Sequence, residues 1–299
     1  MRRLEVPRDA AGSRLDQFLA TRLGSRARAQ RLIDAGQVRV DDQTRAKRHR
    51  LSGGESIAVD EDDPRPMPDV GDAPYRVALE DEYLLVVDKP AGVVVHPGRG
   101  HRTGTLAQAL AGRARGGPEP WRAGIVHRLD RDTSGLLVVA KSEAAHRGLK
   151  AALAARRIER EYLALVHGHP PAGAGTIDAP LGRDRRVRTR ISTETDVPRE
   201  ARTHFTVERR LGRVSLVRVH LETGRTHQIR VHMQAIGHPV VGDPVYASEP
   251  AGESYGLQRQ FLHAVRLAFD HPVHGHRVDV ISPLPADLQG ALTGAQRGG

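Results

Sequence analysis

The chain of 299 residues contains no cysteine, and only 3% of its residues are Phe, Trp or Tyr. The absence of cysteine excludes disulfide bonds, a thiolate nucleophile and a cysteine-based zinc site. So few aromatic side chains argue against a protein that reads single strands by stacking bases. No apolar run approaches the roughly 18 residues of a membrane span, and the basic N-terminus lacks the apolar core of a signal peptide. We therefore expect a cytoplasmic protein that binds no membrane.

Positive charge is what the chain has in excess. It carries 46 Lys and Arg against 36 Asp and Glu, a formal net charge of +10. Such an excess favours a polyanionic partner, of which nucleic acid is the first candidate. An arginine-rich proteome would give the same excess without any such partner. The length is sufficient for two domains, each with its own core.

Residues 1–60 are predicted to form a small module. Apolar side chains recur at helical spacing at Leu15, Phe18, Leu19 and Leu23. Ser25 can cap a second helix, 26–35, and short strands are expected at 38–40 and 57–59. The module holds 13 Lys and Arg and 8 Asp and Glu, a net charge of +5 (13 − 8). The second helix carries Arg26, Arg28 and Arg31, which we expect to contact RNA phosphates, unless they form only a solvated face.

The remaining chain is predicted to form one larger domain. Residues 61–75 hold four prolines and five acids, which indicates a linker. Residues 76–288 are predicted to form an α/β or α+β domain, and residues 289–299 a frayed tail. Within this domain we expect strands at 83–88, 93–96 and 160–167, a hairpin over 201–221, and helices at 105–114, 142–156 and 227–236, the last capped by Thr226.

Two segments concentrate side chains that can do chemistry. Residues 127–135 read HRLDRDTSG and are followed by an apolar run, so a turn can present the Asp130 carboxylate beside a buried strand. Residues 222–233 read ETGRTHQIRVHM, where His227 and Arg230 share one helix face. The 16 histidines show no HExxH motif and no accompanying carboxylate set, so no metal site is predicted.

These two segments, in this order, resemble the signatures of the RluA-type pseudouridine synthases. Shorter segments are also similar to that family, namely VVHPG (94–98), REY (160–162), HPVVGDPVY (238–246) and LHA (262–264). The N-terminal module resembles the "S four" RNA-binding domain, named after a ribosomal protein. The resemblance implies an α+β protein whose catalytic domain has a mixed, mostly antiparallel sheet and a central cleft. It also implies that no metal or cofactor is required.

The resemblance assigns catalytic roles to three residues. Pseudouridine formation breaks the bond between uracil N1 and the ribose, turns the base, and joins C5 to the same sugar carbon. A carboxylate against an electron-deficient anomeric carbon suits this chemistry, and the resemblance gives that role to Asp130. Arg230 is implied to pair with Asp130, and Tyr162 to stack on the uracil or move a proton. A surface arginine and a core tyrosine are the alternatives.

RNA contacts are implied at the same place. A stacked uridine must be flipped out, and Arg128 is implied to fill the gap that it leaves, a surface arginine being the alternative. His127, Arg225 and Ile229 are expected to line the substrate site. Residues 183–190 contain five arginines, which predicts contact with an RNA backbone, although a solvated loop remains an alternative.

Within the family, the VVHPG segment and the N-terminal module are most similar to the type that modifies 23S rRNA of the large ribosomal subunit. We therefore expect a monomer whose partner is 23S rRNA or a pre-50S particle. A synthase acting on tRNA or another site, and a non-catalytic assembly factor, are the alternatives. A third is a hydrolase that uses Asp130 and Asp132 with Mg²⁺.

Overall fold

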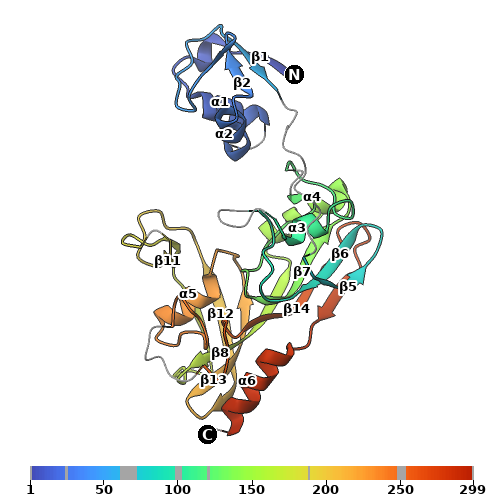
Figure 1. Ribbon diagram of the computed structural model, residues 1–299, viewed down its shortest axis with the longest axis vertical. Helices are drawn as coiled ribbons and strands as arrows, with labels where there is room; N and C mark the ends of the chain where they lie inside the picture. The colour runs from blue at the N-terminus through green and yellow to red at the C-terminus, as the bar shows by residue number, and fades with distance from the viewer. Residues whose placement is uncertain are drawn as a thin grey trace. The chain divides into compact units, whose positions relative to one another are not determined.

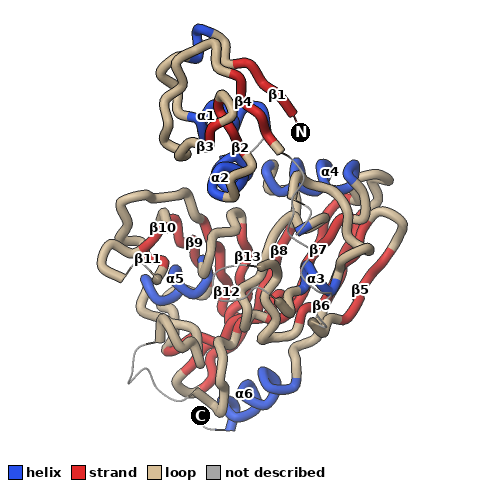
Figure 2. The backbone as a smooth tube through the Cα atoms, turned by 45° about the horizontal axis from the view of Figure 1, so that its top comes forward, coloured by secondary structure: helices blue, strands red, loops and turns tan. Residues whose placement is uncertain are grey.

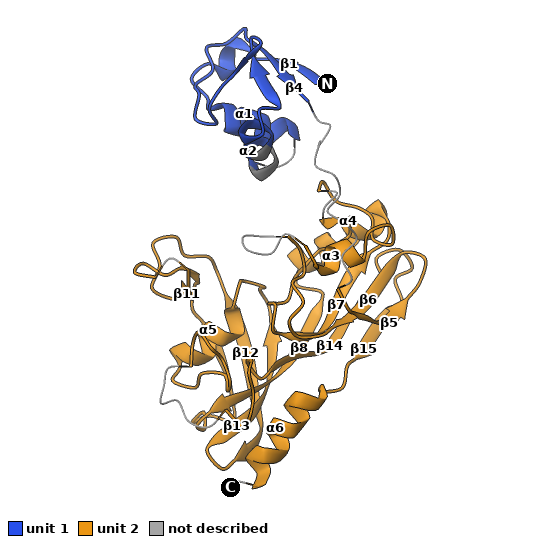
Figure 3. Ribbon diagram, viewed as in Figure 1, with its two compact units in different colours: residues 1–67 blue, residues 68–299 orange. Residues whose placement is uncertain are grey.

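The computed structural model describes residues 2–23, 26–60, 73–97, 103–119, 122–187, 189–247 and 254–297, without the side chains of Ala27, Arg28 and Arg31. The chain divides into two compact units, residues 1–67 and 68–299 (Figure 3). Most of the predicted linker, the predicted cap Ser25, Gly98 of VVHPG and the side chains of Arg28 and Arg31 lie outside the described residues.

The first unit packs two helices against a small antiparallel sheet. Its elements are β1 (Arg2–Glu5), the 3-10 turn η1 (Arg8–Ala10), α1 (Leu15–Leu23), α2 (Arg26–Asp34), β2 (Val38–Val40), β3 (Gln43–Thr44) and β4 (Ser56–Val59), with sheet order β1-β4-β2-β3. The predicted apolar stripe of α1 is buried, and Leu15 and Leu19 pack in one cluster with Val38 and Ile57. The helical spacing therefore predicted this core.

A buried carboxylate links the two helices of this unit. Asp16 is fully buried and accepts hydrogen bonds from Arg14, Arg26 and Gln30. Burial raises the pKa of Asp16, but the hydrogen bonds from Gln30, Arg14 and Arg26 outweigh it and lower the pKa to about 2. Arg26, a predicted RNA contact, thus has an intramolecular partner, although half of its side chain stays exposed.

The second unit is built on a nine-stranded sheet with the order β5-β6-β7-β14-β8-β13-β12-β9, in which β15 also pairs with β14 (Figures 1 and 2). Its strands are β5 (Arg76–Glu80), β6 (Leu84–Lys89), β7 (Ser134–Ala140), β8 (Glu159–His167), β9 (Ala174–Asp178), β12 (Arg202–Leu211), β13 (Val214–Leu221), β14 (Leu262–Asp270) and β15 (Arg277–Ile281). A separate pair joins β10 (Gly182–Arg183) to β11 (Ile191–Ser192). Only β7 and β14 pair in parallel among the described strands, which confirms the mixed, mostly antiparallel class.

Helices cover both faces of the sheet. They are α3 (Leu106–Ala109), α4 (Glu143–Ala154), α5 (Gln228–Ala235) and α6 (Ala286–Arg297). Alternate residues of β6 face opposite sides, because Leu85 packs in the cluster that holds Leu106 of α3, whereas Leu84 packs with Leu149 of α4. Strands buried on both faces read as continuous apolar runs, which explains the segment YLLVVD. None of the described helices has the length and apolar character needed to cross a membrane.

The structure corrects the prediction of a frayed tail. Residues 286–297 form helix α6, and its Leu288, Ala291 and Ala295 are buried in the main core. A face of small side chains produced this packing, which the sequence analysis did not recognise.

Two smaller predictions also fail. The residue that caps α5 is His227 rather than Thr226. Residues 93–96 form no strand, although the backbone carbonyl of Val94 accepts a hydrogen bond from the N–H of Leu106.

Gly135 marks the closest approach between β7 and β14. Its φ is +111°, and a Cβ at this position would lie 2.3 Å from the carbonyl oxygen of Ala264. Only glycine allows both this backbone conformation and this contact. The parallel pairing of β7 with β14 therefore depends on glycine at the start of the strand that follows Asp130.

We expect Gly135→Ala to lower the free energy of unfolding of the protein by about 2–4 kcal/mol, because a backbone must shift to admit the methyl group. Urea unfolding would measure this change. Gly173→Ala is the matched control, since nothing lies within 4 Å of its Cβ position. Equal stability of the two variants would contradict the expectation.

Candidate active site

A buried arginine between two carboxylates forms the centre of the site. Nη1 of Arg230, on α5, donates to Oδ2 of Asp130 at 3.2 Å. Nε and Nη2 of the same guanidinium donate to Asp243 at 2.6 and 2.8 Å. The side chains of Arg230 and Asp243 are 5% and 0% exposed, and that of Asp130 is 15% exposed. The structure thus brings together the two residues that the sequence analysis paired, and adds a third.

Asp243 was missed by the sequence analysis, although it lies in the segment HPVVGDPVY. Its Oδ1 also accepts backbone hydrogen bonds from Val245 and Tyr246, so the loop after β13 and α5 folds around this carboxylate. A guanidinium has five N–H donors and one carboxylate cannot satisfy them, which is the signal that could have revealed a second acid. Burial disfavours the positive charge of Arg230 and lowers its pKa. The hydrogen bonds to Asp243 outweigh this effect and keep the pKa of Arg230 above its usual value.

A buried lysine holds the turn that carries Asp130. Nζ of Lys89 donates to the backbone carbonyls of Pro90, Val93 and Arg131 at 2.8–2.9 Å. Burial lowers the pKa of Lys89 to about 7, against the opposing effect of nearby carboxylates. Because Arg131 follows Asp130 directly, this clamp fixes the backbone on which the carboxylate stands.

Asp130 opens into a small cavity. Tyr162 and Ile229 line it together with Asp130 and Arg230, and both are almost fully buried, at 5% and 4% exposure. Burial raises the pKa of the Tyr162 phenol, so the hydroxyl stays protonated at neutral pH. The cavity therefore offers a carboxylate, a flat aromatic ring and an aliphatic wall.

His227 also faces this cavity and was given no role in the sequence analysis. Its backbone is left-handed, with φ +55°, a conformation that is rare for residues other than glycine. Nδ1 lies 2.9 Å from the hydroxyl of Tyr246, and Nε2 lies 4.0 Å from Oδ2 of Asp130. Strained residues of this kind cluster at functional sites.

A polar network anchors the loop 222–227 that leads into α5. Gln228 accepts from Thr223 Oγ1 and from the backbone N–H of Arg225, and it donates to the carbonyl of Arg202 and to Thr203. All of the hydrogen-bonding capacity of this buried amide is thus used to join the loop to β12.

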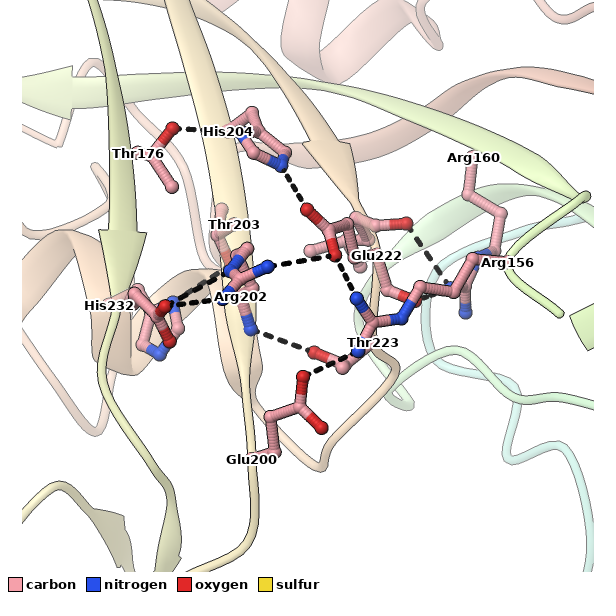
Figure 4. A network of polar contacts seen from close by, with 12 residues as sticks. Arg156, Arg160, Thr176, Glu200, Arg202, Thr203, His204, Glu222, Thr223 and His232 are labelled. Carbon is pink, nitrogen blue, oxygen red and sulfur yellow. Dashed lines mark hydrogen bonds and ion pairs between the residues drawn. The ribbon is translucent and has the colours of Figure 1, made fainter. Parts of the chain in front are cut away.

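Figure 4 shows the carboxylate of Glu222 in contact with Arg156, Arg202 and His204. Arg160 donates to the carbonyls of Leu221 and Glu222 at the base of the same loop. Glu222 therefore neutralises part of the positive charge around it and holds the loop to the sheet.

Two larger, basic cavities adjoin the one above Asp130. One, of about 940 Å³, is lined by residues of the 181–199 segment, and the other, of about 530 Å³, by Lys150, Arg156 and neighbours. Arg128 and Arg225 line all three cavities. Arg128 is exposed, whereas Nε of Arg225 donates to the carbonyl of Glu200. In the predicted arginine loop 183–190, Arg183 and Arg185 line the larger cavity and Arg188 lies outside the described residues.

His127 lies beside one of the basic cavities and is also tied to the sheet. Its Nε2 accepts a hydrogen bond from the backbone N–H of Val138 in β7, at 3.1 Å. Burial, followed by the nearby Arg160, lowers its pKa to about 3, so the ring is neutral at physiological pH. It borders the cavity that contains Lys150, but its hydrogen bond braces β7, and it brings no charge to a polyanion.

No group of three or more His, Asp or Glu side chains within the described ranges could hold a metal ion. The stacked rings of His271, His274 and His276 form part of a turn instead. There Nδ1 of His271 accepts two backbone N–H groups, and Nε2 contacts Asp81.

Comparison with known proteins identifies the two units. The model of the RNA pseudouridylate synthase family matches residues 83–235, which contain Asp130, Tyr162 and Arg230, and the S4 domain model matches residues 13–57. The chain belongs to the RNA pseudouridylate synthase family. The resemblance noted from the two long motifs is thereby confirmed, as is an enzyme of the isomerase class.

Relatives match along almost the whole chain. It is 42% identical to the ribosomal large subunit pseudouridine synthase D of Xanthomonas campestris pv. campestris, over 97% of this chain and 91% of that protein. It is 46% identical to an uncharacterized RNA pseudouridine synthase of Chloroflexus aurantiacus, over 95% and 90%. Among solved structures it is similar to human RNA pseudouridylate synthase domain containing 1, with a TM-score of 0.58 and 30% identity over 75% of this chain and 86% of that one.

We expect Asp243→Asn to lower the free energy of unfolding by about 3 kcal/mol, because Arg230 would lose one of its two buried counter-charges. Asp287→Asn is the matched control. Asp287 also binds an arginine through two hydrogen bonds, at 2.7 and 3.0 Å, but its side chain is 48% exposed. Its removal should cost less than that of Asp243, because solvent screens a half-exposed carboxylate. Urea unfolding of both variants would check this, and a larger loss for Asp287→Asn would contradict it.

Proposed function

We propose that the chain isomerises uridines to pseudouridines in large-subunit rRNA, with Asp130 as the essential catalytic carboxylate. The observation that carries this proposal is the Asp130–Arg230–Asp243 arrangement beside Tyr162 and Ile229. Arg230 keeps Asp130 charged and oriented, so a carboxylate oxygen can face the electron-deficient C1′ of the ribose. Tyr162 and Ile229 provide the two faces between which a flat base fits.

The departing base must remain in the site and react again at C5. A single carboxylate suits this better than the two acids of a glycosidase, because the base is retained instead of being replaced by water. The narrow cavity and the buried wall of Tyr162 keep the base next to C1′ while it turns. No metal or cofactor enters the proposed steps.

Arg128 is proposed to occupy the gap left by the flipped uridine. Its exposed side chain stands where the three cavities meet, two residues before Asp130. The planar guanidinium can stack between bases and bind phosphate at the same time. Arg225 lines the same cavities and can support the flipped nucleotide or its backbone, while Ile229 contacts the base.

The choice of large-subunit rRNA rests on the relatives. Four relatives named ribosomal large subunit pseudouridine synthase D match 93–97% of this chain, at 42–44% identity. The S4 domain supplies a second RNA-binding unit, and Arg26, Arg28 and Arg31 are proposed to contact phosphates there. We further propose a monomer that acts in the cytoplasm on 23S rRNA or on a pre-50S particle.

We expect Asp130→Asn to lower the rate of pseudouridine formation by at least about 10³-fold, because an amide cannot support C1′ as an anion does. Carbodiimide labelling and primer extension on unmodified 23S rRNA and bulk tRNA would measure this, with EDTA present. Asp132→Asn is the matched control, since Asp132 pairs with Arg131 at the surface.

Each alternative predicts a different result in that experiment. Modified sites only in tRNA would keep the reaction and replace the substrate. If the wild type and Asp130→Asn both bound RNA and neither modified it, the protein would be a non-catalytic factor. Activity that disappears in EDTA would favour a metal-dependent reaction at Asp130 and Asp132.

We expect deletion of residues 1–60 to weaken RNA binding in a salt-dependent way and to leave the cleft competent. Each phosphate contact that is lost should reduce the slope of log K against log salt concentration by about 0.7–0.9. Filter binding at several salt concentrations would measure the slope. The same affinity and slope for the truncated and full chains would contradict a binding role for this unit.

A further inference from the structure

His227 stands in the site without a role in the proposal above. Its imidazole lies between Tyr246 and Asp130, with 25% of the side chain exposed to the cavity. The ring also packs edge-on against Tyr246, at 5.6 Å between centroids. A left-handed backbone is unfavourable at a histidine. Such strain is typical of functional sites, which makes His227 a candidate for a functional role.

The hydrogen bonds of Tyr246 favour one tautomer of His227. The Tyr246 oxygen accepts a hydrogen bond from the backbone N–H of Ile191 at 3.1 Å. Its own hydroxyl hydrogen can then point to Nδ1 of His227, 2.9 Å away, which leaves both groups with a partner. Burial raises the pKa of this phenol, so the hydrogen remains on it. A neutral His227 whose Nδ1 accepts must carry its hydrogen on Nε2, the nitrogen that faces Asp130 and the cavity.

The ring remains neutral in this environment. Burial lowers the pKa of His227, with Asp130 and Asp243 opposing the change and Arg230 and Arg128 adding to it. Nε2–H is therefore a fixed hydrogen-bond donor at neutral pH. Arg230 is a second donor close to Asp130, but all three nitrogens of its guanidinium are already bound to Asp130 and Asp243.

The reaction creates a charge that such a donor can stabilise. When the bond between C1′ and N1 breaks, its electron pair stays on uracil, and the negative charge spreads over N1, O2 and O4. C5 then bonds to C1′, the C5 proton leaves, and N1 gains a proton. A donor aimed at the charge before it develops needs no reorganisation during the reaction. A neutral histidine can serve as such a donor without losing its proton.

We propose that His227 is a further catalytic residue, whose Nε2–H donates a hydrogen bond to the detached uracil and stabilises its negative charge until C5 joins C1′. This inference rests on the proposed function. Tyr246 is the positioning residue, because its hydroxyl selects the tautomer. His227 keeps its proton throughout, so C5 loses its proton to solvent water and N1 takes a proton from solvent water, which leaves the total number of protons unchanged.

The first test separates the side chain from the backbone. His227→Gly removes the imidazole and suits the left-handed conformation, while His227→Gln restores an N–H donor. In single turnovers at saturating enzyme, we expect His227→Gly to lower the rate constant by about 10²-fold or more at unchanged RNA affinity. His227→Gln should recover at least about tenfold of that loss. His276→Ala, in the exposed turn before β15, is the control histidine variant and should match wild type.

A substrate change makes the test specific for charge on the base. Fluorine at C5 stabilises the uracil anion, so breakage of the bond between C1′ and N1 in 5-fluorouridine RNA should depend less on the donor. We expect the fall in rate constant caused by His227→Gly to be at least about tenfold smaller on that RNA than on RNA with uridine. The rate would be measured from the 5-fluorouridine consumed, in nuclease digests of the RNA. If the wild type is active and His227→Gly lowers the rate constant equally on both RNAs, or on neither, the inference is overturned. An inactive wild type would overturn the proposed function and the inference with it.

The tautomer can be observed without any reaction. In a two-bond ¹⁵N–¹H spectrum of histidine-labelled protein, the His227 ring should show its hydrogen on Nε2, with assignment from the His227→Gln variant. Tyr246→Phe should remove this preference, because Nδ1 loses its donor. A hydrogen on Nδ1 in the wild-type protein would overturn the inference.

Discussion

The guanidinium of Arg230 and its two carboxylates impose the constraint around which the rest of the site is arranged. A single ion pair at this depth would leave several N–H donors of Arg230 unsatisfied and a strongly desolvated charge. Asp243 meets that need and accepts two backbone N–H groups in addition, so one acid fixes both the arginine and the loop that follows. Asp130 can then remain at the edge of the cluster, with one oxygen bound and the cavity open in front of it.

The contact between Asp130 and Arg230 exists only because the sheet brings together segments that are far apart in the sequence. Asp130 precedes β7, while Arg230 lies on α5, which follows β13 after the loop 222–227. Glycine at 135 lets the backbones of β7 and β14 approach, and Lys89 gathers three carbonyls beneath the Asp130 turn. Gln228 ties the loop 222–227 to β12 through the carbonyl of Arg202. Glu222 ties it to β12 through the side chain of Arg202 (Figure 4). Both sides of the cavity are thus held by internal hydrogen bonds, an arrangement that suits preorganised electrostatic stabilisation.

Positive charge in this chain serves two different purposes. Some arginines are committed to internal carboxylates, as Arg26 is to Asp16 and Arg156 is to Glu222. Others, such as Arg128, stand exposed at the junction of the basic cavities. The count of 46 Lys and Arg residues therefore overstates the number of basic side chains available to RNA. The arrangement of these side chains, and not their number, indicates where a nucleic acid can bind.

The sequence alone determined the family, the antiparallel class, the core of the first unit and the pairing of Asp130 with Arg230. The core of the first unit followed from local periodicity. The family was indicated by the resemblance that two long motifs carry, and the sheet class and the pairing of Asp130 with Arg230 were implied by that resemblance. The sequence did not reveal Asp243 as the second partner of Arg230, the buried face of α6, the bracing role of His127 or the contact of His227 with Tyr246. Each of these depends on which groups meet across the fold, and a guanidinium, an imidazole or a stripe of alanines has no preferred partner until packing supplies one. Only the tertiary structure decides such contacts, because burial sets both the need for a partner and the energy of the interaction.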